Sequence, residues 1–224
     1  MQALLKAFKT EIAPTKEQKE KIIRSIGIAR FLYNQYIAYN KERYKMYQRG
    51  LLDDHQKHFV SANAFDKYVN HKLKKELPWI DTCGSKARKK ALVNAETAFK
   101  KFFKGEALFP RFKKKAKQDV KLYFPKNNKG DWKIWRYKLM IPTLKQVRLK
   151  EFGYLPVGVP VISGTVSCKA GRCYVSAVVD IDEKSKYNKD LEASYQAITD
   201  GIGIDLGVKD LAIVSDGKVF KNIH

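Results

Sequence analysis

The spacing of apolar residues changes once along the chain, near residue 120, and this change limits the possible folds. Before it, apolar side chains recur every three or four residues, as on one face of a helix. The first such stripe is Ile22, Ile26, Ala29, Tyr33 and Tyr36. After it, apolar and polar residues alternate in short runs, as in strands. The pattern predicts an α+β chain whose helical and strand regions are separate in sequence.

Three helices are predicted in the first region. Thr15 and Gln18 have the spacing of a capping box, which predicts a long helix from Thr15 toward Gly50. A weaker amphipathic pattern covers Asp53–Asn70, and a strong one covers Ser85–Phe103. The opening segment, Ala3–Ile12, fits either a strand or one helical turn.

Short strands are predicted in the second region, separated by turn residues, and strands at such spacing suggest a small barrel. They are Val120–Phe124, Trp132–Tyr137, Leu139–Ile141, Val147–Leu149, Val159–Cys168 and Arg172–Ile181. A polar stretch over 183–200 is interpreted as a linker. Gly201–Leu206 and Leu211–Ser215 then form a predicted β-hairpin.

Positive charge indicates the kind of partner. The chain carries 45 Lys and Arg against 23 Asp and Glu, a net charge of +22, which predicts binding to a polyanion. Nucleic acid is the favoured polyanion and a membrane surface is the competing one. The sequence has neither an apolar run of membrane-spanning length nor a signal peptide, so a cytoplasmic location without membrane contact is expected. No feature indicates an oligomeric state.

The charge is densest between Ser85 and Lys117, where 12 basic and 2 acidic residues occur. A charge run is commonly only a solvated helix face, but the balancing acids are missing here and nucleic-acid contact is favoured. Phe109 and Phe112 within it could stack on bases or anchor the segment to the core. The candidate nucleic-acid-binding residues are Arg30, Asn34, Lys86, Lys89, Lys90, Lys100, Lys101, Arg111, Lys113, Lys114 and Lys115.

Cysteines and histidines do not predict a metal centre. Cys83, Cys168 and Cys173 are an odd number and are expected to be free thiols of a reducing compartment. His55 and His58 are three residues apart, but no second pair of ligands accompanies them, so no zinc site is expected.

Asp205 is the candidate metal ligand. It interrupts an apolar run between Gly203 and Gly207, which leave its face of the strand uncrowded. A carboxylate there suits a divalent metal or a phosphate, because burying it unpaired is costly. An ordinary aspartate at a strand end is the alternative.

Short segments along the whole chain resemble, in order, the N-terminal half of the TnpB family of transposon-encoded RNA-guided DNA nucleases. The matching segments are Lys6–Phe8, Pro14–Gln18, Ala29–Asn34, Leu77–Trp79, Ala98–Phe103, Phe109–Lys114, Ile141–Leu144, Gly171–Ser176 and Gly203–Ala212. The resemblance implies a small wedge-like β-barrel with an inserted helical domain, followed by the first β-hairpin of an incomplete RNase H-like α/β domain. The implied domains are 1–13 (first barrel strand), 14–118 (helical recognition domain), 119–182 (rest of the barrel), 183–200 (linker) and 201–224 (start of the RuvC nuclease domain).

The resemblance also implies a function. Asp205 would be the first catalytic carboxylate of a site that binds Mg²⁺, and guide RNA and target DNA would be the partners. The family's other carboxylates and its zinc ribbon lie beyond residue 224, so the chain is expected to hold nucleic acid without cleaving it. Two alternatives stand beside this one: a non-catalytic RNA- or DNA-binding module, and a sugar-kinase or actin-type fold whose first hairpin binds phosphate.

Overall fold

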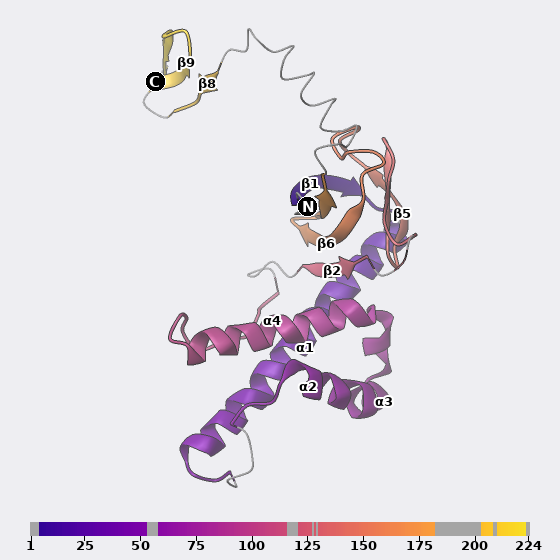
Figure 1. Ribbon diagram of the computed structural model, residues 1–224, viewed down its shortest axis with the longest axis vertical. Coiled ribbons are helices and arrows are strands. Elements are labelled where there is room, and N and C mark those ends of the chain that lie inside the picture. Colours follow the sequence, from indigo (N-terminus) through magenta and orange to yellow (C-terminus); the bar gives the residue numbers. More distant parts are fainter. Residues whose placement is uncertain are drawn as a thin grey trace. The chain divides into compact units, whose positions relative to one another are not determined.

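The structure is a computed structural model that describes residues 5–52, 58–115, 121–126, 128, 130–181, 203–207 and 210–222. It divides into two compact units, Met1–Ile181 and Asp182–His224, and each has its own sheet. In the first unit, a group of helices lies beside a sheet. The long helix α1 extends from the sheet through the group of helices (Figure 1).

Helix α1 (Lys16–Gln48) begins and ends where the sequence predicts. The capping box is present: the Gln18 N–H donates to the Thr15 hydroxyl at 3.2 Å, and the Thr15 N–H donates to Gln18 Oε1 at 3.0 Å. Gly50 follows the helix with a φ of +66°, a conformation that favours glycine. Four of the five stripe residues are buried, whereas Ile26 is half-buried.

The other helices pack against α1. They are α2 (Ala62–Tyr68), the π-helix η1 (Val69–Leu73), α3 (Lys74–Glu76), the 3-10 helix η2 (Pro78–Thr82) and α4 (Ser85–Phe103). Helix α4 has the predicted bounds. The helix predicted over Asp53–Asn70 is confirmed only from Ala62 onward, because Ser61 caps α2 by accepting a hydrogen bond from the Ala64 N–H at 3.3 Å. Residues 53–57 and His55 lie outside the described residues.

Tyr36 lies at the centre of the helical core. Its ring makes edge contacts with Phe65 and Phe99, at centroid distances of 5.4 and 6.3 Å. Its hydroxyl donates to the Val60 carbonyl at 2.6 Å, and the Val60 N–H donates to Asn40 Oδ1 at 2.7 Å. These bonds satisfy buried polar groups and fix the chain before α2 against α1.

The first unit has a seven-stranded sheet among its described residues, in the order β2-β6-β7-β1-β5-β4-β3, and all neighbours are antiparallel. The strands are β1 (Leu5–Ala13), β2 (Leu122–Pro125), β3 (Lys133–Ile134), β4 (Lys138–Ile141), β5 (Lys145–Leu149), β6 (Val161–Lys169) and β7 (Arg172–Asp180). The opening segment is therefore a strand rather than a helical turn, and it joins the later strands as expected.

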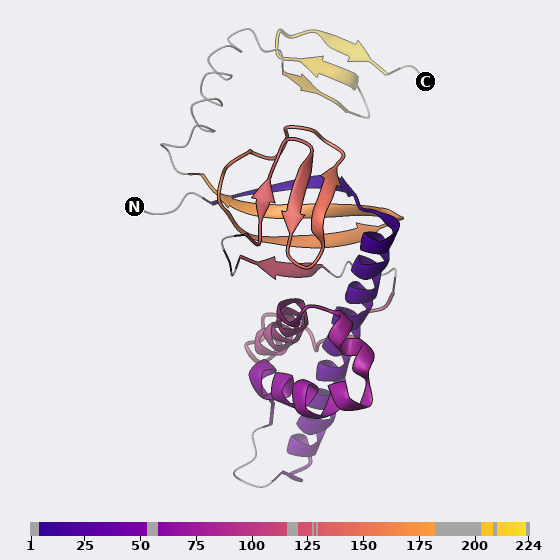
Figure 2. The ribbon, with the colours of Figure 1, turned by 90° about the vertical axis from the view of Figure 1, so that its right-hand side faces the viewer.

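The sheet is open, so the prediction of a β-barrel was wrong. Among the described residues, β2 pairs with β6 and β3 pairs with β4, and no hydrogen bonds join β2 to β3. The short strands β3 to β5 instead cross the long strands β6 and β7, as Figure 2 shows. Alternate residues of both parts are buried, which gives the sheet an apolar inner face.

Cys168 and Cys173 form a disulfide, so the expectation of free thiols was wrong for this pair. They are opposite residues on β6 and β7 next to the predicted turn, where Ala170 and Gly171 have positive φ. The expectation came from the assumed compartment, whereas the hairpin register places the two sulfur atoms together. Cys83 is a free, buried thiol as expected, and burial raises its pKa.

The second unit is a small antiparallel sheet of β8 (Ile204–Asp205), β9 (Asp210–Val214) and β10 (Val219–Lys221), in the order β10-β9-β8. The predicted hairpin is confirmed as β8 and β9, and β10 adds a strand that the sequence analysis missed. The linker predicted over 183–200 lies outside the described residues.

Candidate nucleic-acid interface

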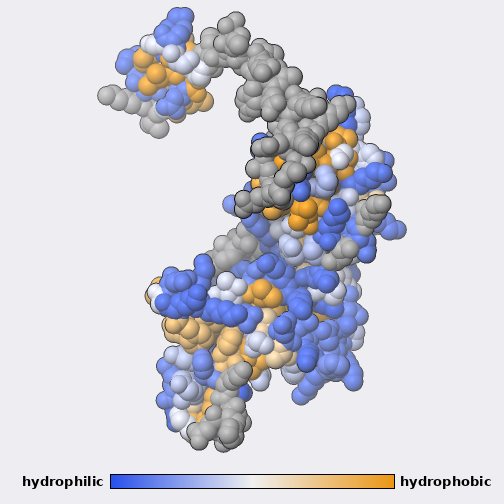
Figure 3. Space-filling view, in the orientation of Figure 1, coloured by the Kyte–Doolittle hydropathy of each residue, from blue (hydrophilic) through white to orange (hydrophobic). Residues whose placement is uncertain are grey.

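Five of the predicted binding residues lie on one side of α4. Helical geometry places Lys86, Lys89, Lys90, Lys100, Lys101 and Lys104 on the same side, which we call the lysine face. All six side chains are exposed, while Ala91, Leu92, Ala95 and Phe99 are buried on the opposite side. The face runs about 27 Å along the helix, at the rise of an α-helix. The surface over α4 is mostly hydrophilic in Figure 3.

Most of this charge has no compensating acid. Lys86, Lys89 and Lys101 have no acidic partner among the described residues, and only Lys100 and Lys104 have one, Glu96 at 3.3 Å and Glu106 at 4.0 Å. Lys90 lies over the Tyr123 ring at 5.3 Å instead. Like charges on one helix face repel each other, so a bound polyanion would stabilise this arrangement.

The basic segment after α4 is held against α1 by Asn34. The Asn34 side chain donates to the Lys113 carbonyl at 3.0 Å and accepts from the Lys113 N–H at 2.8 Å. The Lys113 ammonium lies 4.3 Å from the centre of the Tyr33 ring. Arg111, Lys114 and Lys115 are exposed on the same segment. Asn34 therefore has a positioning role here, which local sequence could not reveal.

The remaining candidates are Arg30, Phe109 and Phe112, and they differ in whether they anchor the core or stay accessible to a ligand. Arg30 is half-exposed one turn before Asn34, on the same side of α1. Phe109 packs edge-on against Phe99 at 5.5 Å and against Phe102 at 5.0 Å, which favours the anchoring role considered for it. Phe112 is 45% exposed and stays a candidate for stacking.

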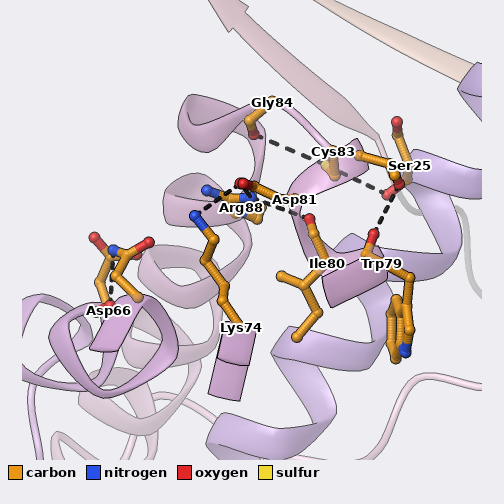
Figure 4. Close-up of polar contacts among 11 residues, drawn as sticks. Ser25, Asp66, Lys74, Trp79, Ile80, Asp81, Cys83, Gly84 and Arg88 are labelled. Carbon is orange, nitrogen blue, oxygen red and sulfur yellow. Dashed lines mark hydrogen bonds and ion pairs between the residues drawn. The ribbon is translucent and has the colours of Figure 1, made fainter. Parts of the chain in front are cut away.

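Arg88 differs from the lysines around it. Its side chain is only 5% exposed, and Figure 4 shows it converging with Lys74 on Asp81. Arg88 Nη1 donates to Asp81 Oδ1 at 2.8 Å and to the Ile80 carbonyl at 3.0 Å. Arg88 belongs to the basic run between Ser85 and Lys117, but its buried side chain joins α4 to η2 and contributes no surface charge.

Asn34→Ala is expected to loosen the segment over 111–115 without unfolding the helical core. It removes two hydrogen bonds to one backbone unit, which predicts a loss of about 1–2 kcal/mol of unfolding free energy. Urea unfolding measures this loss, and hydrogen exchange at Lys113 should show local opening. The control is Gln35→Ala at an exposed neighbouring position. An unchanged exchange rate at Lys113 would contradict the positioning role.

Asp205 lies in β8 opposite Ile213, and its side chain is exposed. The Gly203 N–H donates to Ser215 Oγ at 3.0 Å, and the Gly203 carbonyl accepts from the Ser215 N–H at 2.8 Å. A Cβ at Gly207 would lie 3.0 Å from the Asp210 carbonyl oxygen. Both glycines therefore have contacts within the hairpin in addition to the role predicted beside Asp205.

The acids around Asp205 do not complete a metal site. The two other acids that the structure describes in this unit are paired: Lys221 Nζ is 2.8 Å from Asp210 Oδ1, and Lys218 Nζ is 2.9 Å from Asp216 Oδ2. Hydrogen bonds from Lys218 hold the pKa of Asp216 below its usual range. No group of three or more His, Cys, Asp or Glu that could hold a metal occurs among the described residues. A two-metal site needs further ligands, so these residues alone do not fit Mg²⁺ catalysis.

Comparison with known proteins gives the relationship. A helix-turn-helix domain model matches residues 1–49, the stretch that contains β1 and α1 here. The chain is 29% identical over 220 residues to "Putative RNA-guided DNA endonuclease InsQ" of Escherichia coli (strain K12), covering 98% of this chain and 50% of that protein. It is 26% identical to a "Putative RNA-guided DNA endonuclease" of Streptomyces pristinaespiralis, covering 99% of this chain and 51% of that one.

The chain thus spans about half the length of the curated relatives it matches. None of the helices in its described part is both long and apolar enough to cross a membrane. The two matches extend over nearly all of the chain, including the helices, the sheet and the Asp205 hairpin. These similarities support the resemblance to the TnpB family.

Proposed function

We propose that this chain is the nucleic-acid-binding part of a transposon-encoded RNA-guided DNA endonuclease, and that it holds guide RNA and target DNA. The lysine face carries the proposal, because most of the positive charge along this side of α4 has no acidic partner among the described residues. The names of the two relatives support RNA and DNA as the partners.

Asp205 has a separate part in the proposal. It would be one carboxylate of a RuvC-type nuclease site, and Mg²⁺ would be the metal that activates water in such a site. The described residues supply no further ligands, so this chain on its own would bind nucleic acid without cutting it. A non-catalytic binding module is the second candidate, and the exposed position of Asp205 favours it.

RNA binding is expected to depend steeply on salt. Each phosphate contact releases condensed counterions, so six contacts would lower the affinity by about a hundredfold or more between 50 and 200 mM salt. Fluorescence anisotropy with an RNA hairpin of unrelated sequence measures the slope of log affinity against log salt concentration. A flat response would remove the electrostatic basis of the proposal.

The same titration can separate the two candidates. Adding Mg²⁺ should increase the affinity for DNA of a nuclease part through Asp205, and Asp205→Ala should remove that increase. In a binding module, Mg²⁺ should act only as a competing cation and should weaken DNA binding equally in the unmodified protein and in Asp205→Ala. The salt slope for RNA should be equal in both forms, because the lysine face and Asp205 lie in different units.

A further inference from the structure

A hollow at the end of the helical region is separate from the lysine face. Its volume is about 320 Å³, and it is lined by Lys41, Tyr44, Lys45, Gln48, Phe102 and Phe109, which we call the Tyr44 pocket. The first four residues follow one another on a single side of α1, at helical spacing. The last two come from the end of α4 and the segment after it.

Aromatic rings form the walls of the Tyr44 pocket. Phe102 and Phe109 meet edge-on at 5.0 Å, and the Tyr44 ring lies 5.9 and 6.3 Å from them. All three rings are half-buried, so each is held by its neighbours and still has part of its surface accessible. Such rings can accept another flat ring by stacking or by edge contact.

The rest of the pocket lining is polar and consists of two positively charged groups and one uncharged amide. Lys41 and Lys45 contribute ammonium groups, and Gln48 contributes an amide that can both donate and accept hydrogen bonds. Lys45 also bridges to Glu42 at 2.9 Å, but Glu42 does not line the pocket. Flat apolar walls with positive charge beside them match an aromatic ring that carries a phosphate.

We propose that the Tyr44 pocket holds one unpaired nucleotide. The base would lie against Tyr44, Phe102 and Phe109, Lys41 and Lys45 would contact its phosphates, and Gln48 would hydrogen-bond the edge of the base. The proposal rests on the proposed function and adds a contact that a duplex backbone does not make, because a paired base cannot enter a pocket. The volume is near the lower end for ligand pockets, which suits one nucleotide.

The test uses single-stranded oligouridylate of about twelve nucleotides, a length within the range of single-strand binding sites. A probe of the same length and phosphate number that lacks all its bases is compared with the intact probe on the unmodified protein. Removing the bases is expected to weaken binding about tenfold or more, because no base can then enter the pocket. Equal binding of the two probes would overturn the proposal. The same pair with a deoxyribose backbone, run in parallel, shows whether the nucleotide belongs to RNA or DNA.

A pair of variants locates the effect. Tyr44→Leu should weaken the intact probe about tenfold and remove the difference between intact and abasic probes, with an unchanged salt slope. Tyr39→Leu is the control, because Tyr39 is an exposed tyrosine of α1 that does not line the pocket. Equal losses in both variants would overturn the assignment to the pocket. Absence of any salt-dependent binding in the unmodified protein would instead refute the proposed function.

Discussion

Replacing Lys86, Lys89 and Lys101 together by glutamate is expected to lower RNA affinity by two orders of magnitude or more at low salt. These three lysines have no acidic partner among the described residues, so their whole charge is available to phosphate groups. Each substitution removes a contact and adds a repulsive charge on the same face. Anisotropy titration measures the affinity, and the salt slope should fall by about two, at roughly 0.7 per lost single-strand contact.

The control changes the same charge at another place. Lys67, Lys72 and Lys75 are exposed lysines of α2, η1 and the start of α3, and their replacement by glutamate gives the same net charge. This variant should retain most of the affinity and of the salt slope. Equal losses in the two variants would show that net charge matters rather than the lysine face, and the proposed interface would then be wrong.

Local patterns were enough to predict the main elements of the fold. The capping box at Thr15 and the apolar spacing of α4 concern residues a few positions apart, and both helices have the expected bounds. Sheet closure depends on pairing between distant strands, so the alternation of residues could not show that β2 and β3 stay unpaired with each other. The Cys168–Cys173 disulfide likewise depends on the hairpin register.

The candidate interface was predicted in part, for a similar reason. Charge density identified the exposed lysines of α4, because exposure follows from helical spacing. It could not show that Asn34 positions another segment instead of binding nucleic acid itself, because its partner Lys113 is 79 residues away. Tyr44 was not a candidate, since its pocket exists only once α1 and the end of α4 pack together. Residues that act through distant partners carry no local signal.

Arg88→Ala is expected to destabilise the protein by about 2–3 kcal/mol, although the residue lies in the middle of a basic run. The change removes a buried guanidinium that bonds Asp81 and the Ile80 carbonyl, together with the packing of its stem. Lys89→Ala is the control one residue later. The Lys89 side chain is exposed, so its removal should change the free energy of unfolding by less than about 0.5 kcal/mol. Urea unfolding measures both.

The pH dependence gives the Arg88 prediction a second readout. Hydrogen bonds from Lys74 and then Arg88 hold the pKa of Asp81 below its usual range. A lowered folded pKa contributes stability above the unfolded value of about 3.9, and this is lost as the pH falls through the folded value. The difference in unfolding free energy between Arg88→Ala and the unmodified protein should therefore become smaller in acid.

Because Arg88 is buried, its loss should reduce RNA binding only when the protein is partly unfolded. Lys89→Ala, in contrast, should weaken RNA binding of a fully folded protein. The opposite pattern would place Arg88 in the interface and contradict its structural role.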